Sequence, residues 1–367
     1  MRFPEFSGEW EMASLQDIAA INPKSDQLQN TFIYIDLEAV EKGELRKIQE
    51  IMREEAPSRA QRVINNNDIL FQCVRPYQKN NYIHKILNTS NQQWVASTGY
   101  AQIRTTESPN YIYHLLNTDG FNRKVMVRCT GSSYPAINSE DLATIRFYYT
   151  PDKKEQFKIS RLLDLIDERI ATQNKIIEDL KLLKSAIRKK VFVSLKEEHT
   201  ESCEINQLLT YEQPTAYIVT NDEYSTDTTL IPVLTANKGF VLGYTDEDFS
   251  IYQKGECIIF DDFTMDAKYV SFPFKVKSSA IKILTAKPNV NLRFMFEYLS
   301  YLELKSEEHK RHYISEIASL VVELPSKEMQ NKIASLMTSL DNKLALEENT
   351  KVKYEDEKQY QLSQMFI

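Results

Sequence analysis

The stretch that decides the fold is ISRLLDLIDERIATQNKIIEDL, residues 159–180. Its seam positions step alternately by four and three residues, and all but Gln173 are apolar. They are Ile159, Leu163, Ile166, Ile170, Gln173, Ile177 and Leu180. This heptad spacing predicts a helix that packs one stripe against a partner helix. Neither glycine nor proline occurs between about residues 153 and 193, which predicts one rod roughly 60 Å long.

A second stretch repeats this pattern 174 positions further along the chain. The coincidences are Pro151 with Pro325, Lys153 with Lys327, Gln156 with Gln330, Lys158 with Lys332, Ile159 with Ile333, Leu162 with Leu336, Asp167 with Asp341, Lys184 with Lys358 and Phe192 with Phe366. Ile166 and Ile170 meet Leu340 and Leu344. We therefore predict a second long helix, from about residue 327 to the C-terminus, as the partner of the first. The alternative is two unrelated core helices. Beyond Leu344 the seam is polar, so the last turns either fray or need another subunit.

A region of mixed strand and helix patterns precedes each long helix. Short β-branched or aromatic runs predict strands at residues 32–35, 68–71, 217–219 and 257–260. Short helices are expected near residues 14–20, 111–117 and 292–304. The predicted class is α+β in four parts: a globule at residues 1–150, a long helix at 151–195, a globule at 196–324 and a long helix at 325–367. The two globules resemble each other only faintly, as expected if they bind different ligands.

The composition excludes several classes of protein. Only 8 of 367 residues are glycine, and the chain has no P-loop, no G-x-G-x-x-G and no G-x-S-x-G. Its four cysteines are far apart, so we expect no zinc or other metal site, no disulfide framework and a reducing, cytoplasmic location. We find no signal peptide and no run of about 18 apolar residues, so we expect no membrane partner.

The net charge of −7 argues by itself against a nucleic-acid partner. The charge is unevenly distributed, however. Residues 59–128 carry nine basic and three acidic residues, and residues 267–296 carry six basic residues and no acidic one. Each stretch has a net charge of +6, so we predict one basic sector on each globule. The alternative is that both are ordinary solvated faces.

These two sectors, together with residues shortly before the second, supply the candidate nucleic-acid contacts. Arginine, asparagine and glutamine can pair with base edges, while lysines bind phosphates. The candidates are Arg75, Tyr77, Lys79 and Asn80 in the first globule and Lys238, Thr264, Lys268, Tyr269 and Lys277 in the second. Replacing Lys79 or Lys268 should weaken binding and flatten its salt dependence.

Signals for catalysis are weak. Asp266-Ala267-Lys268 has the D-x-K form of a metal-dependent nuclease, but the upstream acids Asp261 and Asp262 are too near in sequence for the usual strand–turn–strand site. His309 and His312 lie in a highly charged stretch that favours a solvated helix face. No methyltransferase motif [ND]-P-P-[YF] is present. We therefore expect no catalytic residue in this chain.

Several motifs together resemble the specificity subunits of Type I restriction–modification enzymes. They are NDILF (67–71), VRP (74–76), STGYA (97–101), GSSYPAIN (131–138), IPVLTA (231–236), GYT (243–245) and FDDFT (260–264). Glu155-Gln156 followed by Lys158-Ile159 resembles the opening of that family's first long helix. The resemblance covers essentially the whole chain.

The resemblance implies two α/β target-recognition domains separated by two long antiparallel helices that form a coiled-coil spacer. Each domain would read one half of a split double-stranded DNA sequence. The helices would dock two methylation subunits, which bind S-adenosylmethionine, and a nuclease/translocase subunit that uses ATP and magnesium would join them. The chain itself would be non-catalytic and hold no cofactor.

Apolar helix positions are the candidates for helix–helix or partner contacts. They are Ile159, Leu162, Leu163, Ile166, Ile170, Ile177, Leu180, Ile333, Leu336, Leu340 and Leu344. Two competing hypotheses are a coiled-coil scaffold without DNA readout and, with less support, a free-standing nuclease.

Overall fold

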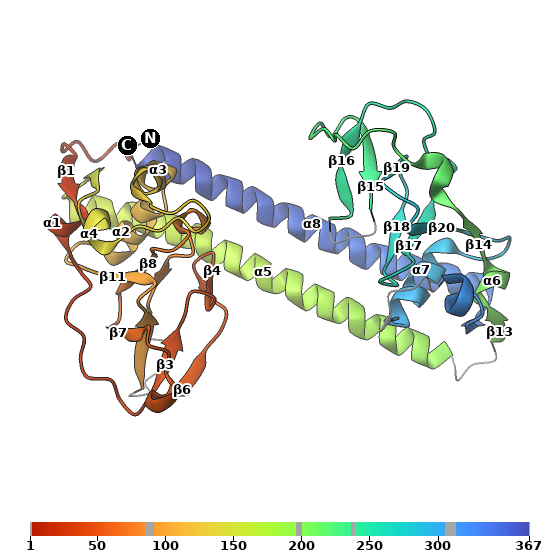
Figure 1. The fold of residues 1–367 in the computed structure, drawn as a ribbon, viewed down its shortest axis with the longest axis horizontal. Helices are drawn as coiled ribbons and strands as arrows, with labels where there is room; N and C mark the ends of the chain where they lie inside the picture. The colour runs from red at the N-terminus through yellow and green to blue at the C-terminus, as the bar shows by residue number, and fades with distance from the viewer. Residues whose placement is uncertain (1, 86–91, 196–199, 236–238, 305–312, 367) are drawn as a thin grey trace. The chain divides into compact units, whose positions relative to one another are not determined.

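A computed structural model describes residues 2–85, 92–195, 200–235, 239–304 and 313–366. The chain forms two compact units. The first consists of Met1–Asn174 and Asn349–Ile367, and the second of Lys175–Glu348. Each unit therefore contains one globule and part of each long helix, and both chain ends lie in the first unit (Figure 1). Among the described residues, no helix combines the length and apolarity that a membrane span requires.

The first unit is built on two four-stranded sheets. Its strands are β2 (Ala19–Ile21), β3 (Thr31–Ile35), β6 (Gln49–Met52), β7 (Ala60–Ile64), β8 (Ile69–Gln72), β9 (Tyr82–Ile83), β10 (Gln93–Ser97) and β11 (Tyr100–Thr105). One sheet has the order β2-β11-β8-β9 and is antiparallel. The other has the order β6-β3-β10-β7, in which β10 runs parallel to β3.

Helices and short strands complete the first unit. They are β1 (Glu11–Ser14), α1 (Leu15–Ile18), β4 (Val40–Glu41), β5 (Glu44–Leu45), α2 (Pro109–Leu116), α3 (Asp119–Arg128), α4 (Ser139–Ala143) and β12 (Arg146–Tyr149). Strand β8 is buried on both faces because a separate core covers each side. Ile69 and Phe71 share a core with Ile112 of α2, whereas Leu70 packs with Ile35 and Tyr100.

The second unit repeats this order with fewer elements. Its strands are β13 (Glu201–Glu204), β14 (Leu209–Glu212), β15 (Ile231–Leu234), β16 (Val241–Thr245), β17 (Cys257–Asp261), β18 (Ala267–Val270), β19 (Lys275–Val276), β20 (Ile281–Ala286) and β21 (Val321–Leu324); its short helices are α6 (Ile205–Leu208) and α7 (Leu292–Tyr301). Sheet β14-β20-β17-β18 matches β2-β11-β8-β9, and β16-β15-β19 matches β6-β3-β10. The globules are therefore much more alike in fold than in sequence.

Most of the short elements expected from the sequence are confirmed. Strands β3, β8 and β17 and helices α1, α2 and α7 lie where the patterns predicted them. The strand predicted at residues 217–219 is wrong. Residues Pro214–Tyr217 form a 3-10 helix, and only Ile218 makes a single bridge to Val276. Pro214 fixes the φ angle at the start of this turn, and the Tyr217 hydroxyl donates a hydrogen bond back to Glu212.

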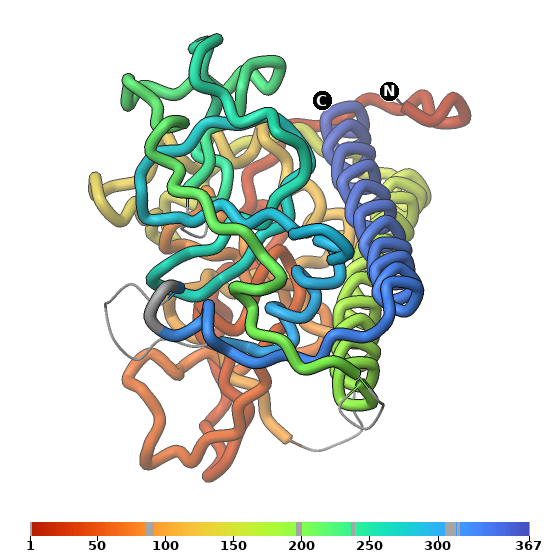
Figure 2. Tube along the Cα trace, turned by 90° about the vertical axis from the view of Figure 1, so that its right-hand side faces the viewer, coloured from red at the N-terminus to blue at the C-terminus, as the bar shows by residue number. Residues whose placement is uncertain are grey.

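Two long helices follow the globules, as predicted. Helix α5 spans Lys153–Leu195 and helix α8 spans Lys327–Met365. In the first unit Lys358 Nζ lies 2.6 Å from Asp167 Oδ1, and in the second Lys184 Nζ lies 2.5 Å from Asp341 Oδ1. A shift of 174 residues converts one ion pair into the other. Within each unit, the segments of α5 and α8 are therefore antiparallel and lie side by side (Figures 1 and 2).

The end of α8 is docked, so the expectation that it frays or needs another subunit is wrong. Leu362 and Met365 belong to the core of the first globule. The Phe366 ring lies 5.2 Å from that of Tyr111 and 6.4 Å from that of Trp10. The polar outer half of α8 thus ends in an apolar anchor, which the heptad pattern alone did not indicate.

Each long helix begins with the same glutamine clamp. Gln156 Nε2 donates to the Thr150 carbonyl (2.8 Å), and its Oε1 accepts from the Ser108 amide (3.0 Å). Gln330 Nε2 donates to the Pro325 carbonyl (2.9 Å), and its Oε1 accepts from Asn291 N (2.8 Å). Ser108 and Asn291 are the N-caps of α2 and α7. One buried amide therefore joins the short helix of each globule to a long helix.

Candidate nucleic-acid interface

The first four candidate contacts lie in one tight turn, which we call the recognition turn (residues 74–80). Its centre is a 3-10 helix at Pro76–Gln78, flanked by Arg75 (φ 54°) and Lys79 (φ 52°) in the left-handed region. Non-glycine residues seldom adopt this conformation, and such strain clusters at functional sites. The Arg75 guanidinium lies 4.3 Å from the centre of the Tyr134 ring. Tyr77 is 50% exposed.

Partners inside the chain already hold two of these residues. Lys79 Nζ lies 2.5 Å from Asp119 Oδ1, and this hydrogen bond lowers the pKa of the Asp119 carboxyl. Asn80 Oδ1 accepts a hydrogen bond from the Lys42 amide at 3.0 Å. Lys79 also lines a groove of about 1000 Å³ between the β4–β5 hairpin, α2 and the long helices. A phosphate at Lys79 would have to compete with Asp119, which is exposed.

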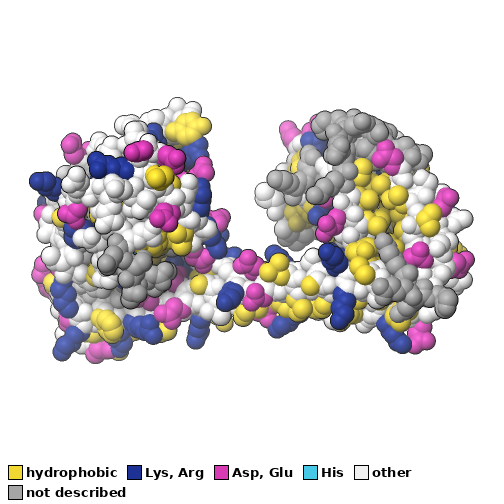
Figure 3. Space-filling model, turned by 90° about the horizontal axis from the view of Figure 1, so that it is seen from below, with side chains coloured by type: hydrophobic (Ala, Val, Ile, Leu, Met, Phe, Trp, Pro, Cys, Tyr) yellow, Lys and Arg dark blue, Asp and Glu magenta, His cyan; other side chains and the backbone are white. Residues whose placement is uncertain are grey.

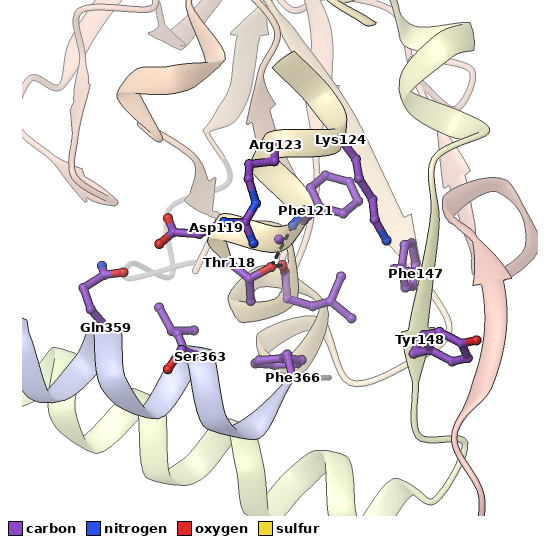
Figure 4. A pocket seen from close by; sticks show the side chains of 13 residues that line it. Thr118, Asp119, Phe121, Arg123, Lys124, Phe147, Tyr148, Gln359, Ser363 and Phe366 are labelled. Atoms are coloured by element: carbon purple, nitrogen blue, oxygen red, sulfur yellow. Dashed lines mark hydrogen bonds between the residues drawn. The ribbon is translucent and has the colours of Figure 1, made fainter. Parts of the chain in front are cut away.

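A smaller cavity of about 310 Å³ lies beside α3 (Figure 4). Arg123 and Lys124 line it from α3, while Gln359 and Ser363 line it from α8, and Phe366 lies at its apolar side. Among the described residues of the chain, no group of three or more His, Cys, Asp or Glu could hold a metal ion. The cavity lies where the end of α8 packs against the first globule. We assign no ligand to it.

The second set of candidates does not converge on one surface. Thr264 and Lys268 are exposed on the β17–β18 hairpin, and Thr264 Oγ1 donates to Asp261 Oδ2 at 2.7 Å. Lys277 is exposed just after β19. Tyr269 lies on the opposite face of β18 from Lys268, with its ring centre 5.8 Å from that of Phe296. The structure thus brings Thr264 and Lys268 onto one hairpin and separates them from Tyr269, while Lys238 lies outside the described residues.

The basic sector predicted at residues 267–296 is only partly a surface feature, because some of its cations are paired inside the fold. Lys275 is fully buried and pairs with Glu247 at 2.6 Å, and Lys282 is buried against Asp262 at 3.3 Å. Arg293 pairs with Glu297 at 2.8 Å. Acids from outside the segment fold against its cations, and a charge count by segment cannot detect that. On the face shown in Figure 3, basic and acidic side chains are interspersed.

Glu247 illustrates how firmly these buried charges are fixed. Burial alone would raise the pKa of its carboxyl, but hydrogen bonds from Lys275 and Thr220 overcome this effect and hold the pKa at about 2. Thr220 donates through both its amide and its hydroxyl, at 2.9 and 2.7 Å. Lys275 is therefore a structural cation that is not available to DNA.

The long helices expose a second kind of candidate surface. Phe157, Leu182 and Leu346 are 67%, 64% and 58% exposed, although each lies on a well-formed helix. Leu336, a candidate contact, is 43% exposed, while its neighbour Met337 is fully buried. The other candidate apolar positions are buried or half-buried. Both long helices therefore leave large apolar side chains exposed to solvent.

The aspartates of the D-x-K motif have structural partners. Asp261 Oδ1 accepts the Phe263 amide at 2.8 Å, and Asp262 pairs with the buried Lys282. Their carboxylates therefore stabilise the hairpin and the core. His309 and His312 lie outside the described residues.

Sequence reasoning missed two contacts. Tyr134, in the GSSYPAIN motif, packs against Arg75 across 59 residues of sequence, and Asp119 neutralises Lys79 across 40. An exposed aromatic residue in a glycine–serine turn was the only available signal for the first. Nothing in the sequence pattern indicated the second.

The sequence of this chain is similar to proteins of known family. The model of the Type I restriction modification DNA specificity domain matches residues 7–182 and again residues 197–355. The Type I restriction enzyme EcoR124I/EcoR124II specificity subunit of Escherichia coli is 39% identical over 142 residues. That alignment covers 37% of this chain and 35% of the E. coli subunit.

Solved structures show a similar fold. A Type I restriction-modification system S subunit from M. genitalium aligns with a TM-score of 0.65 and 14% identity, over 98% of this chain and 96% of that one. A chain from a study of complex assembly and conformational transition of the type I R-M system aligns with a TM-score of 0.59 and 18% identity, over 97% of both chains. At these identities the likeness concerns the fold.

Proposed function

Because this chain belongs to the Type I restriction modification DNA specificity domain family, we propose that it is the DNA-specificity subunit of a Type I restriction–modification complex. The observation that carries the proposal is the duplication. Two family matches each cover one globule and adjoining long-helix sequence, and the two globules share a sheet order while differing in their loops. One chain then reads two different half-sites of double-stranded DNA.

The split of the target follows from the architecture. Matched glutamine clamps and matched Lys–Asp pairs fix each globule to the same pair of helices. The helices then determine the spacing between the two DNA half-sites, and the globules determine which base sequence each half-site has. Since the recognition turn of the first globule has no counterpart in sequence in the second, the target is asymmetric.

The exposed apolar residues of the helices support docking of two methylation subunits. In this proposal those subunits bind S-adenosylmethionine, and a nuclease/translocase subunit uses ATP and magnesium. The scarcity of glycine and the missing phosphate-binding loops agree with that division of labour. The chain itself contributes recognition and no catalysis, and it works in the cytoplasm.

The test is to sequence methylated positions in the genome of cells that express this chain together with its methylation subunits. The expected result is one split, asymmetric motif that disappears when the chain is deleted. A continuous motif, or an unchanged methylation pattern after deletion, contradicts the proposal. Removing four residues from the middle of α5 should change the length of the unspecified spacer while leaving both half-sites intact.

A further inference from the structure

We propose that Arg62 is a DNA-contacting residue of the first globule and presents its two Nη groups to a pair of acceptor atoms on the duplex. The assignment rests on the proposed function. Arg62 was not among the candidates from sequence, because nothing in its neighbourhood resembles a recognition motif.

The geometry of Arg62 suits an external acceptor. It lies on β7 opposite Ala96 of β10, and its side chain is half-buried. Its Nε is buried and has no hydrogen-bond partner in the described part of the chain. Neither Nη group has a partner among the described residues, and neither is sealed from solvent. The Nε end of the guanidinium is therefore buried, while its two Nη groups remain accessible to solvent.

Among the residues that the structure describes, no acid forms an ion pair with this half-buried cation. Other half-buried cations of the first unit have partners: Arg104 pairs with Asp68 at 2.7 Å, and Lys85 donates to Asn67 and Asn110. Burial lowers the pKa of Arg62. Placing a cation in such surroundings costs stability unless an acceptor is supplied. In this chain an acceptor from outside would offset that cost.

Arg62 is also close to the recognition turn. It opposes Ala96, three residues before Gly99, and Gly99 contacts Cys73, which directly precedes residues 74–80. The Cys73 amide donates to the Gly99 carbonyl at 3.0 Å, which fixes this residue beside the start of β11. Among the described residues of the second unit, the three-stranded sheet contains no strand that matches β7. Arg62 therefore belongs to a part of the first globule in which the two readers differ.

The exposed fork of an arginine fits two acceptors that lie side by side. On DNA these are O6 and N7 of a guanine, or two oxygens of one phosphate. A guanine contact specifies one base, whereas a phosphate contact adds affinity at every sequence and one unit of salt dependence. The guanine assignment predicts that a lysine at this position fails to restore discrimination, because lysine lacks the planar fork.

The experiment uses the full-length chain in complex with its methylation subunits and duplexes that carry the methylated motif. Arg62→Met should weaken binding by about tenfold or more, while the thermal midpoint stays unchanged or rises. The matched control is Arg59→Met, which removes the same charge from an exposed side chain three residues earlier. It should change binding by less than about twofold.

The outcomes separate cleanly. For Arg62→Lys, lost discrimination at one base position identifies a guanine contact, and near-wild-type binding identifies a phosphate contact. Wild-type affinity of Arg62→Met, or an equal loss in Arg59→Met, overturns the assignment. Failure of the wild-type complex to prefer the motif over a scrambled duplex overturns the proposed function instead.

Discussion

The two units share one backbone frame, in which a short helix packs against the two long helices, but different side chains make that contact in each unit. In the first, His114 of α2 meets Asp164 of α5 at 2.8 Å, and Asn110 donates to the same carboxylate at 2.6 Å. In the second, Glu297 of α7 lies six residues after its N-cap, as His114 does, yet it is a fully buried carboxylate. The backbone frame is therefore conserved between units, while the charges that secure it have diverged.

The largest expected effect is on Glu297. Its carboxylate meets Arg188 at 2.7 Å, Arg293 at 2.8 Å and Lys184 at 3.5 Å. Glu297→Ala leaves Arg188 without its acid partner, whereas Lys184 and Arg293 keep Asp341, and it should lower the free energy of unfolding by about 3–5 kcal/mol. His114→Ala should cost less, because Asp164 keeps Asn110. Urea unfolding of both variants measures the difference, and equal losses would show that the two anchors are equivalent.

The next largest effect concerns His84, which should make the stability of the first unit sensitive to acid. Both ring nitrogens of His84 are buried beside Trp94 with no hydrogen-bond partner among the described residues, and burial lowers the pKa of its imidazole to about 4. The unfolded chain binds the proton near pH 6.5, so the first unit loses stability as pH falls from about 6.5 to 4, by at most about 3 kcal/mol. Unfolding monitored by Trp94 fluorescence from pH 7.5 to 4.5 measures it. His84→Gln should flatten this dependence, and a steep profile in that variant would contradict the assignment.

The glutamine clamps should behave alike despite these differences. Gln156→Ala and Gln330→Ala each remove a buried amide that bonds two backbone groups, and each should cost about 2 kcal/mol. Denaturant unfolding of both variants tests this. Gln359→Ala, an exposed position on α8, provides the control and should change stability by less than about 0.5 kcal/mol. If one clamp variant lost twice as much free energy of unfolding as the other, the two glutamine clamps would not be equivalent.

The sequence predicted the frame because the frame is local and repeated. The heptad at residues 159–180 and the 174-residue shift lie within single helices, so both long helices could be recognised without any tertiary information. The candidate site was far less accessible. Lys275 and Lys282 looked like surface cations because their partners, Glu247 and Asp262, lie 28 and 20 residues earlier in the chain. Only folding brings those acids to them.

The smallest effect is also the most direct test of the shared frame. Lys184–Asp341 and Lys358–Asp167 are the same ion pair in two copies, and their partly exposed side chains limit each to about 0.5–1 kcal/mol. Double-mutant cycles with alanine should give coupling energies that agree within about 0.3 kcal/mol. Lys184 also approaches Glu297, whereas Lys358 has no such neighbour among the described contacts, so Lys184→Ala alone should cost more than Lys358→Ala. Equal coupling energies together with unequal losses in the two single lysine variants would show that the helix pairing is the same in both units. The difference between the units would then lie in the contacts that each globule makes with the helices.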